Sequence, residues 1–112
     1  MLLVLSCLLF PAAAFSAPVF KWKAEGIAVC EATGDQFTPK IISDGAGGII
    51  IAWRDKRNGN SFDDIFCQRV LAGGTLAWAT AGVALSLAAN GQWAPVIAED
   101  GAGGGIAAWH DE

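Results

Sequence analysis

Short apolar runs separated by glycine-rich or polar turns recur along the chain and predict an all-β fold. Residues 39–43 form a run rich in isoleucine that predicts a strand. Residues 44–48 read Asp-Gly-Ala-Gly-Gly, and such residues supply the positive φ angles of tight turns at little cost. Residues 49–53 are apolar at consecutive positions. A strand of this kind is expected to be buried on both faces.

The pattern continues through a polar loop at residues 55–62, a predicted strand at 64–70 and a turn at 72–74. A fourth strand is predicted at residues 75–78, and residues 79–90 then lead into the next unit. Four short strands joined by turns form an antiparallel meander. Both faces of such a sheet can be apolar only where other sheets cover them, as they do in a β-propeller.

An internal repeat supports this architecture. Residues 22–56 align with residues 78–112 without a gap, at an offset of 56 residues (78 minus 22). The turn at 44–48 recurs as 100–104, and residues 52–55 recur as 108–111. Repeats of this length are characteristic of stacked units. We therefore expect propeller-type blades, each an antiparallel four-stranded sheet.

The phase of the repeat divides residues 18–112 into about one and a half units of an incomplete propeller. The first unit covers about residues 22–77 and the partial second unit about residues 78–112. Residues 20–22 align with the predicted fourth strand, and the sequence stops after the second strand of the next unit. This phase predicts that the chain is a fragment of a larger protein with further blades.

Residues 1–17 differ from the rest and predict a secretory signal peptide. An apolar run at 2–10 is followed by small residues, with cleavage expected after Ala14 or Ala17. A membrane anchor is the rival interpretation, but Pro11 interrupts the run well before the ~20 residues that a spanning helix needs. Lipidation at Cys7 is a third, although the apolar run continues past it. We expect a secreted or cell-surface protein without a membrane segment after cleavage.

Composition and charge narrow the class of partner. The chain is 54% hydrophobic and 16% charged, so it can bury a core. Its net charge of −4, with scattered lysines and arginines, argues against nucleic-acid binding, which needs a basic patch. After signal removal Cys30 and Cys67 remain. They could form a disulfide in an oxidising compartment or stay as two buried thiols.

Residues 52–59 and 64–70, which read Ala-Trp-Arg-Asp-Lys-Arg-Asn-Gly and Asp-Ile-Phe-Cys-Gln-Arg-Val, resemble repeats of large secreted bacterial proteins identified as β-propellers. The resemblance implies an extracellular protein and no specific ligand. The chain is remotely similar to sialidase-like and quinoprotein-like propellers as well. It lacks the sialidase order of the aspartate box and has no tyrosine, and only residues 74–78 match the quinoprotein pattern.

The candidate binding residues are Asp55, Arg57, His110 and Asp111, all in loops after a predicted strand. Asp55 and Arg57 could bind a ligand, or the carboxylate could cap the turn and pair with the guanidinium. His110 replaces Arg54 in the second unit and has no metal partner or catalytic triad in the sequence.

For two further features, the sequence favours a structural role over ligand binding. Trp53 and its repeat counterpart Trp109 could line a sugar platform, but tryptophan at a repeated strand position more often packs in a core. Asp63 and Asp64, with Asn58 and Asn60, suggest calcium, but their spacing does not match a known calcium loop. We predict no catalytic residue, metal or cofactor.

The sequence thus favours a non-catalytic extracellular repeat module, acting as a scaffold or a recognition surface. Its expected partners are further blades of the same protein and a carbohydrate or a cell-surface protein. The alternative is a fragment of a propeller-fold extracellular enzyme, such as a glycosidase or a lyase, whose catalytic residues lie outside this chain.

Overall fold

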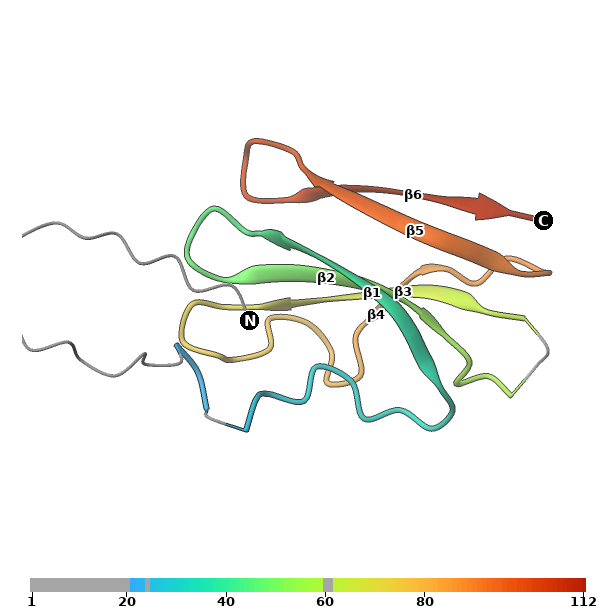
Figure 1. The fold of residues 1–112 in the computed structure, drawn as a ribbon, viewed down its shortest axis with the longest axis horizontal. Coiled ribbons are helices and arrows are strands. Elements are labelled where there is room, and N and C mark those ends of the chain that lie inside the picture. Colours follow the sequence, from blue (N-terminus) through green and yellow to red (C-terminus); the bar gives the residue numbers. More distant parts are fainter. Residues whose placement is uncertain (1–20, 24, 60–61) are drawn as a thin grey trace, which may run out of the picture.

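The computed structural model describes residues 21–112 except 24, 60 and 61, so the predicted signal peptide lies outside the described residues. The described chain contains six strands and no helix. They make a four-stranded antiparallel sheet and a separate two-stranded hairpin (Figure 1). The strands of the sheet, in spatial order, are β1 (Gln36–Ser43), β2 (Ile49–Asp55), β3 (Asp64–Val70) and β4 (Val83–Ser86). The hairpin consists of β5 (Gln92–Glu99) and β6 (Gly105–Asp111).

The all-β prediction is confirmed, and the four-stranded antiparallel sheet is present. The residues that the structure describes do not form a propeller. The hairpin repeats β1 and β2 at the same offset of the sequence repeat, whereas β4, which lies in the second sequence unit, completes the sheet of the first. The hairpin lies against β1 and β2, with β5 as the contacting strand.

The fourth strand predicted at residues 75–78 is wrong. This segment has a single isolated bridge, from Leu76 to Val70, and the strand beside β3 is β4. The buried side chain of Gln68 explains the difference. Its amide donates to the carbonyl of Ala79 at 2.7 Å, and its oxygen accepts from the Trp78 N–H at 3.2 Å. Beyond the backbone bond from Ala77 N to Arg69 O, the Gln68 side chain takes the place of ladder hydrogen bonds, and strand pairing resumes only at Val83.

Strand β2 is buried on both faces, as its apolar run predicts. Ile51 and Trp53 point to one face, where they pack with Phe66 and Val70. The chain before β1, residues 22–30, covers this face with Trp22, Ile27 and Val29. The other face carries Ile50, Ala52 and Cys67, all buried, and faces the β5–β6 hairpin. Two layers of neighbouring chain therefore enclose the sheet.

The repeat extends to details of the backbone. Both hairpins have a β-bulge at the same place, between Phe37 and Lys40 and between Trp93 and Val96. Within the bulges Thr38 and Ala94 both have a positive φ, 46° and 49°. Each is followed by a proline, whose missing N–H is tolerated where the ladder is interrupted. The two units therefore share a backbone design as well as a sequence pattern.

The turn predicted at residues 44–48 is confirmed, and its copy closes the second hairpin. Asp44 Oδ1 accepts the N–H groups of Ala46 and Gly48 at 2.9 and 2.7 Å. Asp100 Oδ1 accepts the two equivalent N–H groups at 2.7 and 2.9 Å. A Cβ on Gly48 would lie 2.7 Å from the Asp44 carboxylate, so the turn needs glycine there. The aspartate and the glycines act together to fix the hairpin.

Candidate functional site

Asp55 is the centre of the most densely bonded polar cluster among the candidate residues. It ends β2, and its side chain is fully buried. One carboxylate oxygen accepts from Trp53 Nε1 at 2.7 Å and from Arg57 Nη2 at 2.6 Å. The other accepts from the backbone N–H and Nε of Arg57, at 2.8 and 2.9 Å. Both oxygens are therefore occupied by neighbouring protein groups.

Arg57 joins three parts of the chain. Besides the fork on Asp55, its Nη2 donates to the carbonyl of Ala81 at 2.8 Å, just before β4. Its guanidinium lies over the Phe66 ring, 3.6 Å from the centroid, a cation–π contact. The Cys30 sulfur lies 3.3 Å from Nη2. The cluster ties the ends of β2 and β4 to the segment before β1.

The bonding of this cluster sets its charge state. Burial by itself raises the pKa of Asp55, but hydrogen bonds from Arg57 and Trp53 outweigh it and hold the pKa below its usual value. The Asp55 side chain in turn raises the pKa of Arg57. Both groups stay charged at neutral pH. The turn-capping interpretation of Asp55 and Arg57 describes the geometry that the structure shows.

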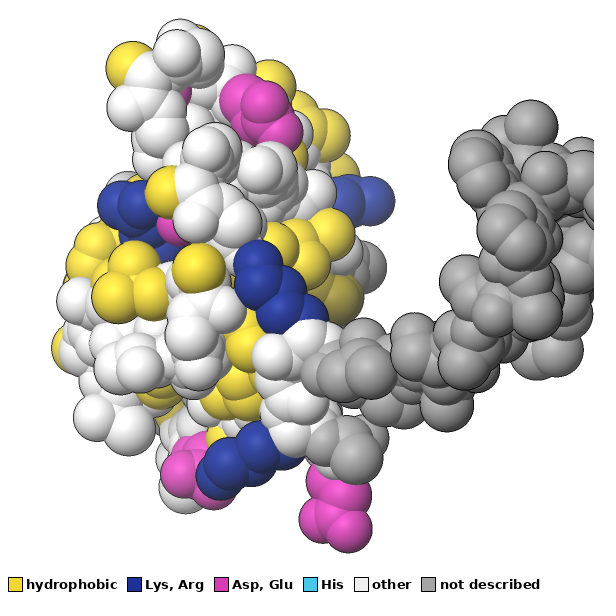
Figure 2. All heavy atoms as spheres, turned by 90° about the vertical axis from the view of Figure 1, so that its left-hand side faces the viewer, with side chains coloured by type: hydrophobic (Ala, Val, Ile, Leu, Met, Phe, Trp, Pro, Cys, Tyr) yellow, Lys and Arg dark blue, Asp and Glu magenta, His cyan; other side chains and the backbone are white. Residues whose placement is uncertain are grey.

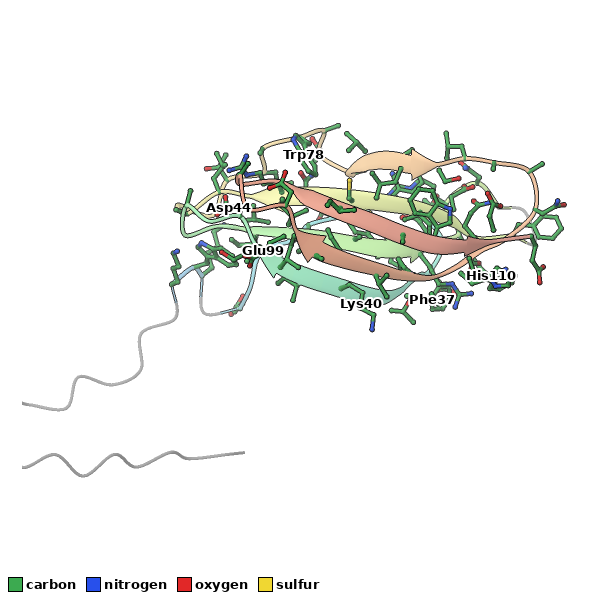
Figure 3. The ribbon with its side chains drawn as sticks, turned by 90° about the horizontal axis from the view of Figure 1, so that it is seen from above. Phe37, Lys40, Asp44, Trp78, Glu99 and His110 are labelled. Carbon is green, nitrogen blue, oxygen red and sulfur yellow. The ribbon has the colours of Figure 1, made fainter. Side chains whose placement is uncertain are left out.

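His110 and Asp111 lie in the second unit, at the end of β6, and both are exposed. Figure 3 shows His110 at the same end of the molecule as Phe37, away from Asp44 and Trp78. Asp111 Oδ1 accepts from Gln92 Nε2 at 3.2 Å. The four candidates thus form two separate groups at repeat-related positions, Asp55 with Arg57 and His110 with Asp111.

The sequence missed a second charged cluster, which joins the two units. Arg54 forms an ion pair with Asp63, whose carboxylate is fully buried, and Lys56 lies 3.7 Å from the same carboxylate. The Arg54 guanidinium lies 4.8 Å from the Trp93 ring centroid. The carbonyl of Asp63 accepts the N–H of Gln92 at 2.9 Å. The Arg54–Asp63 pair lies within the first unit, whereas the contacts with Trp93 and Gln92 depend on how β5 docks against the sheet.

The suggested calcium ligands are directed to other partners. Asp63 faces Arg54, whereas Asp64 accepts from Asn58 Nδ2 at 2.6 Å. Asn60 lies outside the described residues. Within residues 21–59 and 62–112, no group of three His, Cys, Asp or Glu side chains could hold a metal ion. The described part of the chain also has no helix long and apolar enough to cross a membrane.

Cys30 and Cys67 are both free thiols. They lie on opposite faces of the sheet, since Cys30 contacts the Asp55–Arg57 cluster and Cys67 pairs with Ala52 beside the hairpin. Burial raises the pKa of Cys67 to about 11. In the structure they are separate thiols, as in the second sequence alternative, but only Cys67 is buried and Cys30 is half-buried.

A mostly apolar cavity of about 430 Å³ lies between the sheet and the hairpin. Its walls include Ile50 and Cys67 of the first unit and, from the second unit, Trp78, Leu85, Ala107 and Trp109. Trp53 is 3% exposed and packs in the core, so it offers no sugar platform. Trp109 is half-buried and faces this cavity.

At the end of the molecule that carries the turns, the described residues form no broad patch of one charge. In Figure 2, Lys and Arg side chains lie scattered among acidic, apolar and uncharged ones.

The comparisons with known proteins add no relative: no protein-family model, no curated protein and no solved structure matches this chain.

Proposed function

We propose that the chain is a non-catalytic, extracellular repeat module of the propeller type, in which each unit docks on the face of the one before it. One observation carries this proposal: Ile50, on the hairpin of the first unit, is 4% exposed because the hairpin of the second unit covers that face. The equivalent Ile106 is 66% exposed on the outer face of the second unit. A design that repeats can cover Ile106 in the same way, with a further unit.

The polar chemistry of the described residues supports a structural role. The carboxylate of Asp55 and the guanidinium of Arg57 bond to each other and to the backbone, which leaves no free carboxylate oxygen for a substrate. Arg54 and Asp63 neutralise each other at the junction of the two units. These clusters hold strands and units together. A scaffold or a recognition surface for a carbohydrate or a cell-surface protein needs such rigidity.

The phase of the repeat offers a direct experiment. Because residue 112 is the repeat equivalent of residue 56, copies of residues 57–112 can be appended to the full chain in register. If the units stack, each copy adds a unit–unit interface, and the free energy of unfolding rises with every copy. The rise should end when the array closes into a ring of ~4–8 blades.

The matched control carries Ile106→Lys in the parent chain and in every copy. This change blocks the face on which each next unit docks. The control series should therefore gain little stability per copy. Equal unfolding midpoints for all lengths, with or without Ile106→Lys, would contradict the stacking proposal.

The extracellular location has its own test. Expression of the chain in a bacterial host, followed by N-terminal sequencing of the exported product, should give a first residue of Phe15 or Pro18. A product that keeps Met1 and stays inside the cell would contradict it.

A further inference from the structure

The free edge of β6 adjoins the 430 Å³ cavity, and together they form a surface that lacks an occupant among the described residues. In the hairpin, β6 pairs only with β5. Ladder bonds of an antiparallel strand alternate in direction. Since Asp100 N bonds to Gly104 O at 3.1 Å, Ile106 and Ala108 direct their backbone groups to β5. Ala107 and Trp109 therefore direct theirs to the free edge.

The first unit shows what fills the equivalent space. There the edge of β2 is paired along its whole length with β3. Phe66 and Val70 of β3 pack beside Trp53, with the Phe66 and Trp53 ring centroids 6.5 Å apart. Gln68, between them on the same face, bonds to the chain ahead of β4. One strand thus supplies both backbone pairing and core side chains.

Two walls of the cavity correspond to walls of the first-unit core, but that strand is missing between them. Ala107 and Trp109 are the repeat equivalents of Ile51 and Trp53. Trp78 and Leu85, which line the opposite side, are the equivalents of Trp22 and Val29, which cover the first-unit core. Trp78 and Leu85 are 37% and 39% exposed, so this side of the cavity is open.

We propose that the edge of β6 and this cavity bind an extended strand of the β3 type, antiparallel to β6. This interaction deepens the proposed function and rests on it. The strand would place an aromatic residue and, four residues later, a β-branched one into the cavity, with a polar residue between them, as Phe66, Gln68 and Val70 do in the first unit. Its main chain would bond to Ala107 and Trp109 by β-augmentation.

The test uses the full chain and a synthetic peptide of residues 63–71 that carries Cys67→Ser. Amide hydrogen exchange of Ala107 and Trp109 is measured with and without the peptide. At about ten times the dissociation constant, the peptide should slow exchange at both amides about tenfold, since the free fraction falls by that factor. Exchange in β2, whose edge is already occupied by β3, should not change.

Two controls isolate the two parts of the interaction. A peptide that also carries Phe66→Asp and Val70→Asp keeps the backbone but loses the cavity side chains, and should not bind. Ala107→Pro removes an N–H at the free edge, where proline is tolerated, and should abolish binding while the hairpin stays folded. Ile106→Lys, on the opposite face of β6, should leave binding intact.

The proposal would be overturned if Ala107 and Trp109 of the folded chain gained no protection, or if the Asp-substituted peptide protected them equally. Protection at β1 or β4 instead of β6 would overturn it as well. So would protection that depends on the concentration of the chain without peptide and that the peptide does not alter. The last would assign the edge to a second copy of the chain. A chain with one appended copy of residues 57–112 separates this failure from that of the proposed function. It gains stability if units stack, and it should no longer bind the peptide if its own third strand fills the edge.

Discussion

Ile50 and Ile106 occupy the same position in the two repeat units, but one is 4% exposed and the other 66%. The difference arises from their neighbours, because both residues lie at the start of a strand that follows the same Asp-Gly-Ala-Gly-Gly turn. The second hairpin covers Ile50, and no described residue covers Ile106 in the same way. The pair is a built-in comparison of a docked face with an undocked one.

The same substitution at these two positions should have very different effects on stability. Ile50→Lys buries an ammonium group between the sheet and the hairpin, and should lower the free energy of unfolding by about 3 kcal/mol or more. Ile106→Lys should change it by less than about 0.5 kcal/mol and should reduce self-association. Urea unfolding and sedimentation velocity measure the two effects. Equal destabilisation by both changes would show that β5 does not cover Ile50.

Asp55 and Asp111 form a second matched pair, with the charge buried in one unit and exposed in the other. Asp55→Asn leaves the Arg57 guanidinium, which is 16% exposed, without its counter-charge, and should destabilise the chain by about 3 kcal/mol. In Asp111→Asn the new amide oxygen can still accept from Gln92, so the loss should be below about 1 kcal/mol. Urea unfolding measures the loss of stability in both variants. A small loss in Asp55→Asn would show that the Asp55–Arg57 cluster contributes little to stability.

Acid should unfold the protein through three carboxylates. Backbone hydrogen bonds from Ala46 and Ala102 are the leading causes that lower the pKa of Asp44 and Asp100, and Arg57 offsets burial at Asp55. A carboxylate whose pKa is lower in the folded state than in the unfolded state stabilises the fold. This contribution is complete above the pKa of the unfolded state, about 3.9, and is lost as the pH falls through the pKa of the folded state. The free energy of unfolding should therefore be nearly constant from pH 7 to about 5 and decline below about 4.

The same measurement on Asp55→Asn serves as the control for this pH dependence. Without the Asp55 carboxylate, one of the three contributions is missing, so the decline below about pH 4 should be shallower. An unchanged acid slope in this variant would show that Asp55 does not contribute.

The two thiols should differ sharply in reactivity. Cys67 is 4% exposed, and with a pKa of about 11 it is almost entirely protonated at pH 8. Cys30 is half-buried beside the Asp55–Arg57 cluster. Iodoacetamide should label Cys30 in the native protein and Cys67 only after unfolding, as peptide mass mapping would show. Native labelling of Cys67 would contradict its burial, and a Cys30–Cys67 disulfide in the air-oxidised protein would contradict the placement of these residues on opposite faces.

The repeat, the turns and the first three strands could be predicted from sequence because their signals are local. Glycines with positive φ, Asp44 and a run of isoleucines each determine the structure within a few residues. The fourth strand could not be placed, because the side chain of Gln68 interrupts the pairing of β3 with the residues that follow the next turn. The pattern of hydrophobic residues does not show where a side chain takes the place of a backbone hydrogen-bonding partner.

For the candidate site, sequence reasoning gave both alternatives for Asp55 and Arg57, and the structure shows the capping geometry. It did not find the contact of Arg54 with Asp63 and Trp93. The contact with Asp63 lies within the first unit, whereas the contact with Trp93 exists only once the second unit docks, because Trp93 follows Arg54 by 39 residues along the chain. Charge at a unit junction is thus predictable from sequence only when the docking is already known.

Docking of the second hairpin on the first unit brings Gly105 of β6 close to Ile42 of β1. The Ile42 Cδ1 atom of β1 lies 2.9 Å from where a Cβ on Gly105 would stand. The measurement uses isotopically labelled Ile106→Lys protein, because this substitution should reduce self-association. A nuclear Overhauser effect should connect the Ile42 δ1 methyl to the Gly105 α protons. The absence of this contact, with both hairpins folded, would contradict the account.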